Sequence, residues 1–294
     1  MNIKFLKAGM FTTIQDCGRF GLAHLGIPCS GYMDVQSAEL ANTMLGNQNC
    51  EGLLEVTWTG VEFVTDVACS IALAGAEFVV SVNDEVVSTD DVIQLQAGDV
   101  FKMKQLLTGV RAYLSFAGGI DLQQMAGSVS TLAVAQLGGI RGRSLKDGDC
   151  LKLKQPHQVQ GKKKPLWKKI KPKNIHVVRA LPGPEKHWFD AITCRQAYGQ
   201  AYQLTQDCNR QGFRLSSAKV AYPANYHMDS SGLVAGSLQV TPDGQTILAM
   251  KDAQTTGGYP RILVVNQNEL YQLAQVRPDE IVYFFVNHDE SVFN

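Results

Sequence analysis

A lysine-rich, proline-punctuated segment divides the chain into two halves. Seven lysines occur between Lys162 and Lys173, and prolines are spaced through and around them. Because like charges repel and proline is excluded from helix and strand interiors, we expect an exposed, extended connector here. A docking site for an acidic partner is the alternative interpretation. The sequence therefore predicts two domains, 1–158 and 175–294, joined by a basic linker over 159–174.

Both halves are dominated by short segments that are typical of β-strands. They are rich in β-branched and aromatic residues and are separated by turn-forming residues. Helical spacing of apolar residues is confined to 36–45, which Gly46 and Asn47 close as a C-cap, and to 269–275. The expected strands are 61–67, 70–74, 77–82, 92–95, 100–103, 111–116, 175–179, 200–204, 247–250, 262–265 and 281–286. This pattern predicts a mainly β fold with a few helices, a barrel or sandwich in each half, and excludes a Rossmann fold.

Charge and hydropathy exclude several classes of protein. The 27 basic residues balance the 27 acidic ones, whereas general nucleic-acid or membrane-surface binders carry a basic excess, so neither partner is expected. No segment approaches the roughly 18 apolar residues of a membrane helix. Lys4 and Lys7 interrupt the N-terminal segment, so it is not a signal peptide and a cytoplasmic location is expected. The charged fraction of 18% is low, which weakly favours a heteromeric partner.

Local motifs for metal, thiol or phosphate chemistry are missing. The seven cysteines are scattered without a CxxC pair, so we expect no disulfide framework and mostly small buried thiols in a reducing compartment. The six histidines lack metal-ligand spacing, so no metal site is expected. There is no P-loop, nucleophile elbow or HExxH motif. Met250-Lys251 is similar to a biotin-attachment turn, but Asp252 follows it, so we expect no covalent biotin on this chain.

Six glycine- and hydroxyl-rich segments contain embedded charges and are the candidates for chemistry. Glycine lets backbone N–H groups approach an anion, and arginine offers a planar fork to carboxylate or phosphate. Taken singly, each segment can equally be a tight turn or a bulge. The segments are 12–21, 30–34, 116–143, 209–215, 231–244 and 254–260. Their number favours the convergence of some of them on one polar pocket.

These segments together resemble one known family. The strings TTIQDCGRFG, SGYMD, AGGID, GGIRGR, RQGFRL, GLVAGSLQVTPDG, QTTGGYPRI and LAQVRPDE occur in order from about Gly9 to Phe285. Their order is similar to that of the KipA-like family, which contains the C-type subunits of 5-oxoprolinase. That family is related to allophanate hydrolase subunit 2 and to the carboxyltransferase domain of biotin-dependent urea carboxylase. The resemblance implies two tandem cyclophilin-like β-barrel domains.

The resemblance also implies an activity that requires partner proteins. Family members work with a KipI-like partner and a LamB/YcsF-type partner, and the complex opens 5-oxoproline to glutamate with ATP and Mg. Because a lactam is a poor electrophile, phosphorylation of its carbonyl oxygen would create a leaving group before water attacks. Arginines and backbone donors would stabilise the charge that develops. We therefore expect the C-type subunit of an ATP-dependent 5-oxoprolinase, a lactam hydrolase.

Site residues follow from the positions that match the motifs. Asp16 or Asp34 would accept a proton, and Arg210 would stabilise the reacting group. The residues expected to bind substrate or anion are Arg19, Ser30, Asn42, Gly212, Arg214, Gln239, Gln254, Thr255, Thr256, Gly257, Gly258 and Tyr259.

Departures from the family pattern leave two alternatives open. Asn209 stands where the family often has Asp, Ser231 where it has Glu, and Ala253 where it has Arg. The fold should tolerate these changes, whereas the activity or substrate could differ. One alternative is a carboxyltransferase-like component of a urea or amide carboxylase, or of an allophanate hydrolase system, served by a biotin carrier on another chain. The other is a non-catalytic, KipA-like binder of a KipI-type kinase inhibitor, which the lost acidic groups favour.

Overall fold

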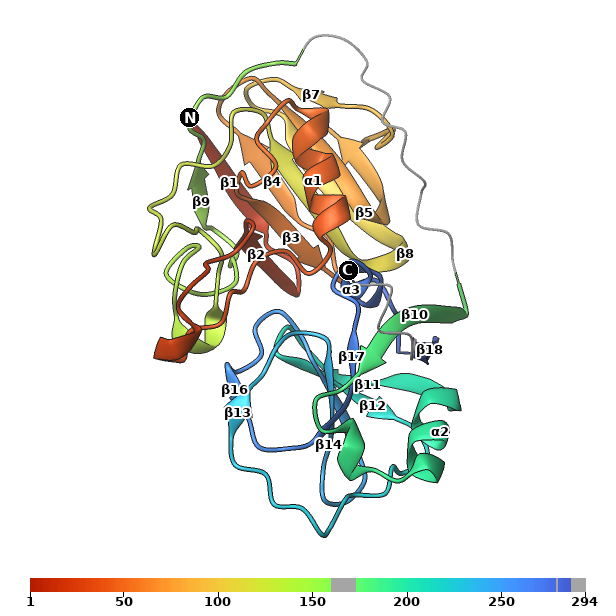
Figure 1. Cartoon of the computed structure of the whole chain (residues 1–294). Helices are drawn as coiled ribbons and strands as arrows, with labels where there is room; N and C mark the ends of the chain where they lie inside the picture. Colours follow the sequence, from red (N-terminus) through yellow and green to blue (C-terminus); the bar gives the residue numbers. More distant parts are fainter. Residues whose placement is uncertain (160–172, 279, 287–294) are drawn as a thin grey trace. The chain divides into compact units, whose positions relative to one another are not determined.

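The chain consists of two compact units (Figure 1). The computed structural model describes residues 1–159, 173–278 and 280–286. The first unit takes Met1–Arg19 and the described residues from Ser30 to Val159, and the second takes the remainder, including Phe20–Cys29. The short segment 20–29 thus belongs with the second unit, although the sequence placed it in the N-terminal domain. Residues 160–172 of the predicted linker lie outside the described residues.

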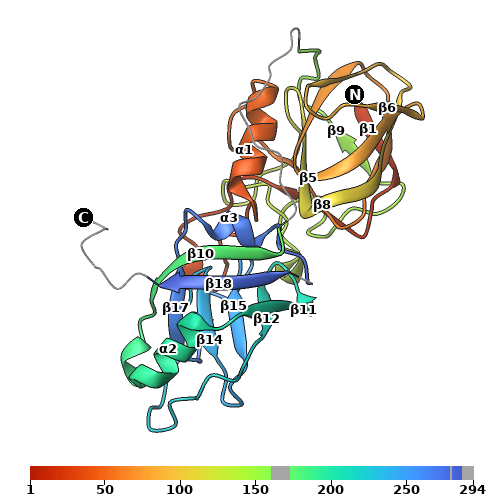
Figure 2. The same cartoon turned by 90° about the vertical axis from the view of Figure 1, so that its right-hand side faces the viewer.

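The first unit is built on a nine-stranded antiparallel sheet. Its order is β2-β3-β8-β4-β1-β9, with β5 paired to β8 and the short β6 and β7 paired to β5. The strands are β1 (Asn2–Lys7), β2 (Phe11–Gln15), β3 (Leu53–Thr57), β4 (Glu62–Thr65), β5 (Cys69–Val82), β6 (Glu85–Val87), β7 (Ile93–Leu95), β8 (Val100–Phe116) and β9 (Cys150–Lys152). Figure 2 shows this sheet curling on itself. Its core includes Phe63, whose ring stacks on Phe101 at 4.9 Å.

Helix α1 (Val35–Met44) packs on β5 and β8. Its buried Ala38 and Ala41 contact a cluster that includes Leu53 and Tyr113. The short 3-10 helices of the chain are η1 (Ala23–Leu25), η2 (Ala133–Ala135) and η3 (Lys186–Trp188). No helix in the described ranges combines the length and hydrophobicity that a membrane crossing requires.

Strands β5 and β8 are continuous where the sequence predicted two segments each. No turn interrupts β8 at Thr108-Gly109, because Thr108 pairs with Glu77 inside the sheet. Gly75 and Gly109 have φ values of 85° and 70°, and the register shifts between Gly75 and Glu77. Glycine adopts this left-handed conformation without a steric clash, so each strand bends at a bulge and continues.

The second unit is a closed seven-stranded barrel of order β10-β17-β14-β15-β12-β11-β18. Its strands are β10 (Ile175–Pro182), β11 (Tyr202–Cys208), β12 (Gly212–Ser216), β14 (Ser237–Val240), β15 (Thr246–Ala249), β17 (Arg261–Val265) and β18 (Ile281–Val286). Strands β10 and β18 lie side by side in Figure 2 and close the barrel as a parallel pair. Phe213, Leu238 and Phe284 fill its core, each at most 1% exposed.

Two helices and one pair of short strands accompany the barrel. Helix α2 (Ala191–Gly199) contacts β18, α3 (Leu270–Leu273) contacts β10, and β13 (Ser231–Gly232) pairs with β16 (Thr256–Gly257). The predicted mainly β fold with few helices is confirmed, and each expected strand coincides with part of an observed one. Among the described strands, however, only those of the second unit close into a barrel, whereas the sheet of the first unit stays open.

The expectation for the cysteines is wrong in two respects. Cys17 and Cys50 form a disulfide that joins the loop after β2 to the loop before β3, with a Cα–Cα distance of 5.0 Å. The other five cysteines are free, and only Cys69 and Cys194 of them are buried. The pairing joins residues 33 positions apart, and tertiary folding rather than a local motif brings them together.

Candidate functional site

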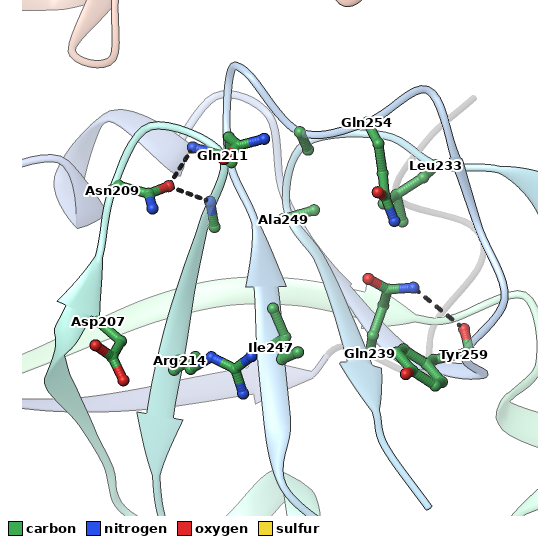
Figure 3. A pocket seen from close by; sticks show the side chains of 12 residues that line it. Asp207, Asn209, Gln211, Arg214, Leu233, Gln239, Ile247, Ala249, Gln254 and Tyr259 are labelled. Carbon is green, nitrogen blue, oxygen red and sulfur yellow. Dashed lines mark hydrogen bonds between the residues drawn. The ribbon is translucent and has the colours of Figure 1, made fainter. Parts of the chain in front are cut away.

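A pocket of about 230 Å³ lies on the outer face of the second unit's barrel (Figure 3). Strands β11, β12, β15 and β14 contribute its floor, and the segment between β15 and β17 contributes a wall. Side chains alternate between the two faces of a strand. In β12, Phe213 and Leu215 are buried, so Gly212 and Arg214 face outward. Arg214 lies opposite Ile247 of β15.

The pocket brings together part of the predicted binding set. The lining residues are Asp207, Asn209, Gln211, Gly212, Arg214, Leu233, Gln239, Ile247, Ala249, Ala253, Gln254 and Tyr259. Gly212, Arg214, Gln239, Gln254 and Tyr259 were expected to bind ligand, and the other seven were not. Three of those seven, Asp207, Ile247 and Ala249, lie on strands, and the other four lie in connecting segments, so only the three-dimensional structure brings them together.

The lining is polar and electrically balanced. Arg214 and Asp207 are its only charged side chains, and neither forms a hydrogen bond or ion pair through its side chain with another described residue. Four side-chain amides also line the pocket, from Asn209, Gln211, Gln239 and Gln254 (Figure 3). Among the described residues, the lining contains no serine, threonine, cysteine, histidine or lysine. The pocket can therefore bind and orient a small polar molecule, but it offers none of these side chains as a nucleophile.

Two buried ion pairs hold the ends of the wall segment. Arg210 binds Asp252 in a bidentate manner, with Nε to Oδ2 at 2.8 Å and Nη2 to Oδ1 at 2.9 Å. At the other end, Arg261 Nε donates to Glu185 Oε2 at 2.8 Å, and Arg261 Nη1 donates to the Gly232 carbonyl. Burial alone would raise the pKa of Glu185, but the hydrogen bonds from Arg261 outweigh it and hold that pKa below its ordinary value.

The placement of Arg210 bears on its predicted catalytic role. Arg210 does not line the pocket, and its side chain is only 6% exposed, as is that of Asp252. The Asp252 N–H also donates to the Arg210 carbonyl at 2.8 Å. Catalysis by Arg210 stays a prediction, while these contacts favour a positioning role for it.

The threonine-glycine segment, residues 255–258, supports the pocket without lining it. Gly257 pairs with Ser231 between β16 and β13, and the Leu233 N–H donates to the Thr255 carbonyl at 2.8 Å. A Cβ atom at Gly257 would lie 2.6 Å from Gln239 Nε2, so glycine leaves space for that amide. Thr256 and Gly258 belong to the same wall segment but do not line the pocket.

Asp16 and Arg19 lie in the first unit, where both are buried. The Asp16 carboxylate accepts hydrogen bonds from Ser128 Oγ at 2.6 Å, Val129 N at 2.7 Å and Ser130 Oγ at 2.5 Å. Arg19 Nη2 donates to the Ser130 carbonyl. These bonds fasten the loop after β2 to the segment 128–130, and a role for Asp16 as a general base stays a prediction.

The remaining predicted residues of the first unit also have structural contacts. Asp34 caps α1 and accepts hydrogen bonds from Ser37 N at 3.0 Å and Ser37 Oγ at 2.6 Å. Asn42 accepts a hydrogen bond from Ser115 Oγ at 2.6 Å. Ser30 is 2% exposed and donates to a backbone carbonyl. Their roles in binding or catalysis stay predictions.

Sequence reasoning missed a buried polar cluster in the first unit. Glu55 is fully buried, and its Oε2 accepts hydrogen bonds from Met33 N at 3.0 Å and from Tyr113 Oη at 2.8 Å. Arg111 Nε lies 3.8 Å from Glu55 Oε1. Burial and the nearby Glu55 carboxylate raise the pKa of Tyr113. Strand-like sequence around these residues concealed the cluster.

Among the described residues, no group of three or more acidic, cysteine or histidine side chains is placed to hold a metal ion.

Comparison with known proteins gives consistent matches along the chain. The chain is 37% identical over 288 residues to the C-type subunit of 5-oxoprolinase from Escherichia coli (strain K12), covering 96% of this chain and 90% of that protein. The protein of the same name from Haemophilus influenzae is 34% identical, with the same coverage. Among solved structures, Kluyveromyces lactis urea carboxylase superposes with a TM-score of 0.87 at 28% identity. That match covers 96% of this chain and 27% of the urea carboxylase chain.

The family assignment follows from these matches and from a family match that spans most of the chain. Residues 25–286 match the family described as "Carboxyltransferase domain, subdomain A and B". Two relatives of the chain exceed 30% identity over nine-tenths of their length. The chain belongs to the carboxyltransferase domain, subdomain A and B, family.

Proposed function

We propose that this chain is the C-type subunit of an ATP-dependent 5-oxoprolinase complex, which opens 5-oxoproline to glutamate. The observation that carries the proposal is the end-to-end match to the C-type 5-oxoprolinase subunit of Escherichia coli, at 37% identity over 90% of that protein. Such colinearity extends over both units of this chain, so the likeness is not confined to a shared fold. A cytoplasmic location, where ATP is available, belongs to the same proposal.

The chemistry of the pocket supports a division of labour in the complex. Its arginine and amides suit a lactam acid, whereas its lining lacks the nucleophilic side chains named above. We expect a KipI-like partner and a LamB/YcsF-type partner to complete the site. ATP and Mg would bind at the level of the complex, and the products would be glutamate, ADP and phosphate. This chain would bind and orient the lactam.

Reconstitution tests the proposal. The chain is co-expressed with the two expected partners and purified through a tag on this chain, and glutamate and ADP are measured with 5-oxoproline and ATP. We expect glutamate formation that requires all three proteins, with the mixture lacking this chain as the control. A stable complex of the three proteins that forms no glutamate would refute the proposal.

A carboxyltransferase-like role is the second candidate. The superposition on urea carboxylase with a TM-score of 0.87 favours it, although the chain spans only 27% of that protein. In this case a biotin carrier on another chain would deliver a carboxyl group to urea or another amide. Transfer from a carboxylated carrier to urea in the presence of this chain would support this role, and the 5-oxoprolinase proposal would then fail. Binding of a KipI-type inhibitor without turnover of any amide would instead support a non-catalytic role.

A further inference from the structure

We propose that the pocket on the second unit's barrel binds a small carboxylic acid that also carries an amide, and that Arg214 anchors its carboxylate. The inference rests on the proposed function only for the identity of the natural ligand, 5-oxoproline. The Arg214 guanidinium, the charge of the lining, its amides and its volume all contribute to the argument.

The position of Arg214 makes its guanidinium available to a ligand. Phe213 and Leu215 are packed in the barrel core, so β12 presents Arg214 on the outer face, where its side chain is exposed (Figure 3). The guanidinium has no hydrogen-bond or ion-pair partner among the described residues. Arginine matches the two oxygens of a carboxylate with two parallel N–H donors. An arginine that needs no counterion from its own chain is suited to an anionic ligand.

The charge of the pocket selects the kind of anion. Arg214 and Asp207 give the lining a net charge of zero. The several negative charges of a nucleoside triphosphate would face one guanidinium and one carboxylate. Its binding would be unfavourable without further cations. A single carboxylate pairs with Arg214 and leaves Asp207 free to accept a hydrogen bond from an N–H group. The lining therefore favours a monocarboxylate over ATP.

The amide side chains provide partners for an amide on the ligand. Asn209 Oδ1 already accepts from Gln211 N at 2.8 Å and Gly212 N at 3.3 Å, which turns its Nδ2 donor to other partners. Gln239 Nε2 donates to the Tyr259 carbonyl at 3.5 Å, which leaves its Oε1 to accept. A lactam offers one N–H donor and one carbonyl acceptor, and the pocket holds complements to both.

The volume limits the ligand to a small metabolite. The pocket measures about 230 Å³, which is below the roughly 300–1,000 Å³ of pockets for drug-sized ligands. A five-membered lactam with one carboxylate fits this size class. Urea also fits, but it has no charge for Arg214 to bind. The pocket thus distinguishes the two candidate substrates by charge rather than by size.

Binding to the full-length chain tests the role of Arg214 directly. Affinities for 5-oxoproline and for 2-pyrrolidinone, the same lactam without the carboxylate, are measured by calorimetry. Since charge-assisted hydrogen bonds contribute about 1.5–3 kcal/mol, we expect Arg214→Gln to weaken 5-oxoproline binding roughly 10- to 100-fold. Binding of 2-pyrrolidinone should not change, and Arg214→Lys should restore part of the affinity for 5-oxoproline. The matched control is Arg195→Gln, an exposed arginine on α2 that does not line the pocket.

The outcomes separate this inference from the proposed function. Equal binding of 5-oxoproline by wild type and Arg214→Gln, or Arg214-dependent binding of ATP or biotinamide instead, overturns the inference. If the chain binds 5-oxoproline only within the complex, the KM of the complex for 5-oxoproline is measured instead. An unchanged KM in the Arg214→Gln complex overturns the inference, while the proposed function stands. A wild-type complex without turnover, combined with Arg214-dependent binding of 5-oxoproline, overturns the function while the inference stands. Thermal unfolding of each variant verifies that it is folded.

Discussion

The Arg210–Asp252 pair should contribute to the free energy of unfolding of the second unit, and a double-mutant cycle measures this contribution. Both side chains are 6% exposed and are joined by two hydrogen bonds. Arg210→Met removes the guanidinium that pairs with the buried Asp252 carboxylate, and Asp252→Leu removes the carboxylate that pairs with the guanidinium. Each single change should cost about 3–5 kcal/mol of unfolding free energy, because an uncompensated buried charge is expensive. The double variant replaces both charges by apolar groups and should recover most of that loss.

Urea unfolding followed by the fluorescence of Trp188 measures these free energies. Trp188 lies in the second unit and stacks on Tyr226 at 5.0 Å, and a Trp58→Phe/Trp167→Phe background makes it the single tryptophan of the chain. The reasoning is refuted if Arg210→Met costs less than about 1 kcal/mol, or if the double variant is as unstable as the two single losses combined.

The same cycle distinguishes the positioning role of Arg210 from the catalytic role that the sequence suggested. If Arg210 only positions the wall segment, a stable double variant should regain much of its affinity for 5-oxoproline. If Arg210 contacts the ligand, affinity should stay low although stability returns. Calorimetric titration of the double variant, compared with both single variants, gives the answer.

Three further changes test other parts of the structure. The pKa of Glu185 is lower in the folded chain than in the unfolded chain, where it is about 4.3. The ionised Glu185 carboxylate therefore stabilises the fold above that pH, and this stabilisation is lost as the pH falls through the folded pKa. The stability gap between wild type and Glu185→Gln, measured by urea unfolding, should therefore shrink below about pH 4, and a constant gap would contradict this. The Cys17–Cys50 disulfide closes a 33-residue span, so replacing both cysteines by serine should destabilise the first unit by about 3–4 kcal/mol. A loss below about 1 kcal/mol would argue against the crosslink. Burial raises the pKa of Cys69 to about 11, so iodoacetamide at pH 8 should modify the exposed Cys29 well before Cys69, as peptide mass spectrometry would show; the reverse order would refute the burial.

Local periodicity explains which elements the sequence could predict. Helix α1 has a helical repeat of apolar residues and β18 is a continuous run of β-branched and aromatic residues, so both positions were predicted closely. Strands β5 and β8 were each divided because glycine is a turn signal in sequence, and only the pairing of Thr108 with Glu77 shows a bulge instead. Strands β1 and β2 were missed, although in β1 Ile3 and Phe5 alternate with polar or charged residues as in a half-buried strand.

The candidate site was only partly predictable for a different reason. Sequence identifies residue types, but not whether their polar atoms already have partners. Asp16 is engaged by Ser128 and Ser130, more than a hundred positions away, and Arg210 by Asp252. Nothing in the sequence distinguishes Arg214 from Arg210. The two arginines differ only in the three-dimensional structure, where one meets a buried carboxylate and the other faces an open pocket.

The parallel pairing of β10 with β18 has a consequence for how the second unit folds. These strands are the first and last of the barrel, so Ile175 pairs with Ile281 across nearly the whole length of the unit. A contact between such distant residues costs loop entropy before it contributes any stability, and proteins rich in such contacts fold slowly. Fragments that end before β18 would leave two unpaired strand margins, which invite association with other chains. The barrel is thus protected from aggregation only once its final strand has docked.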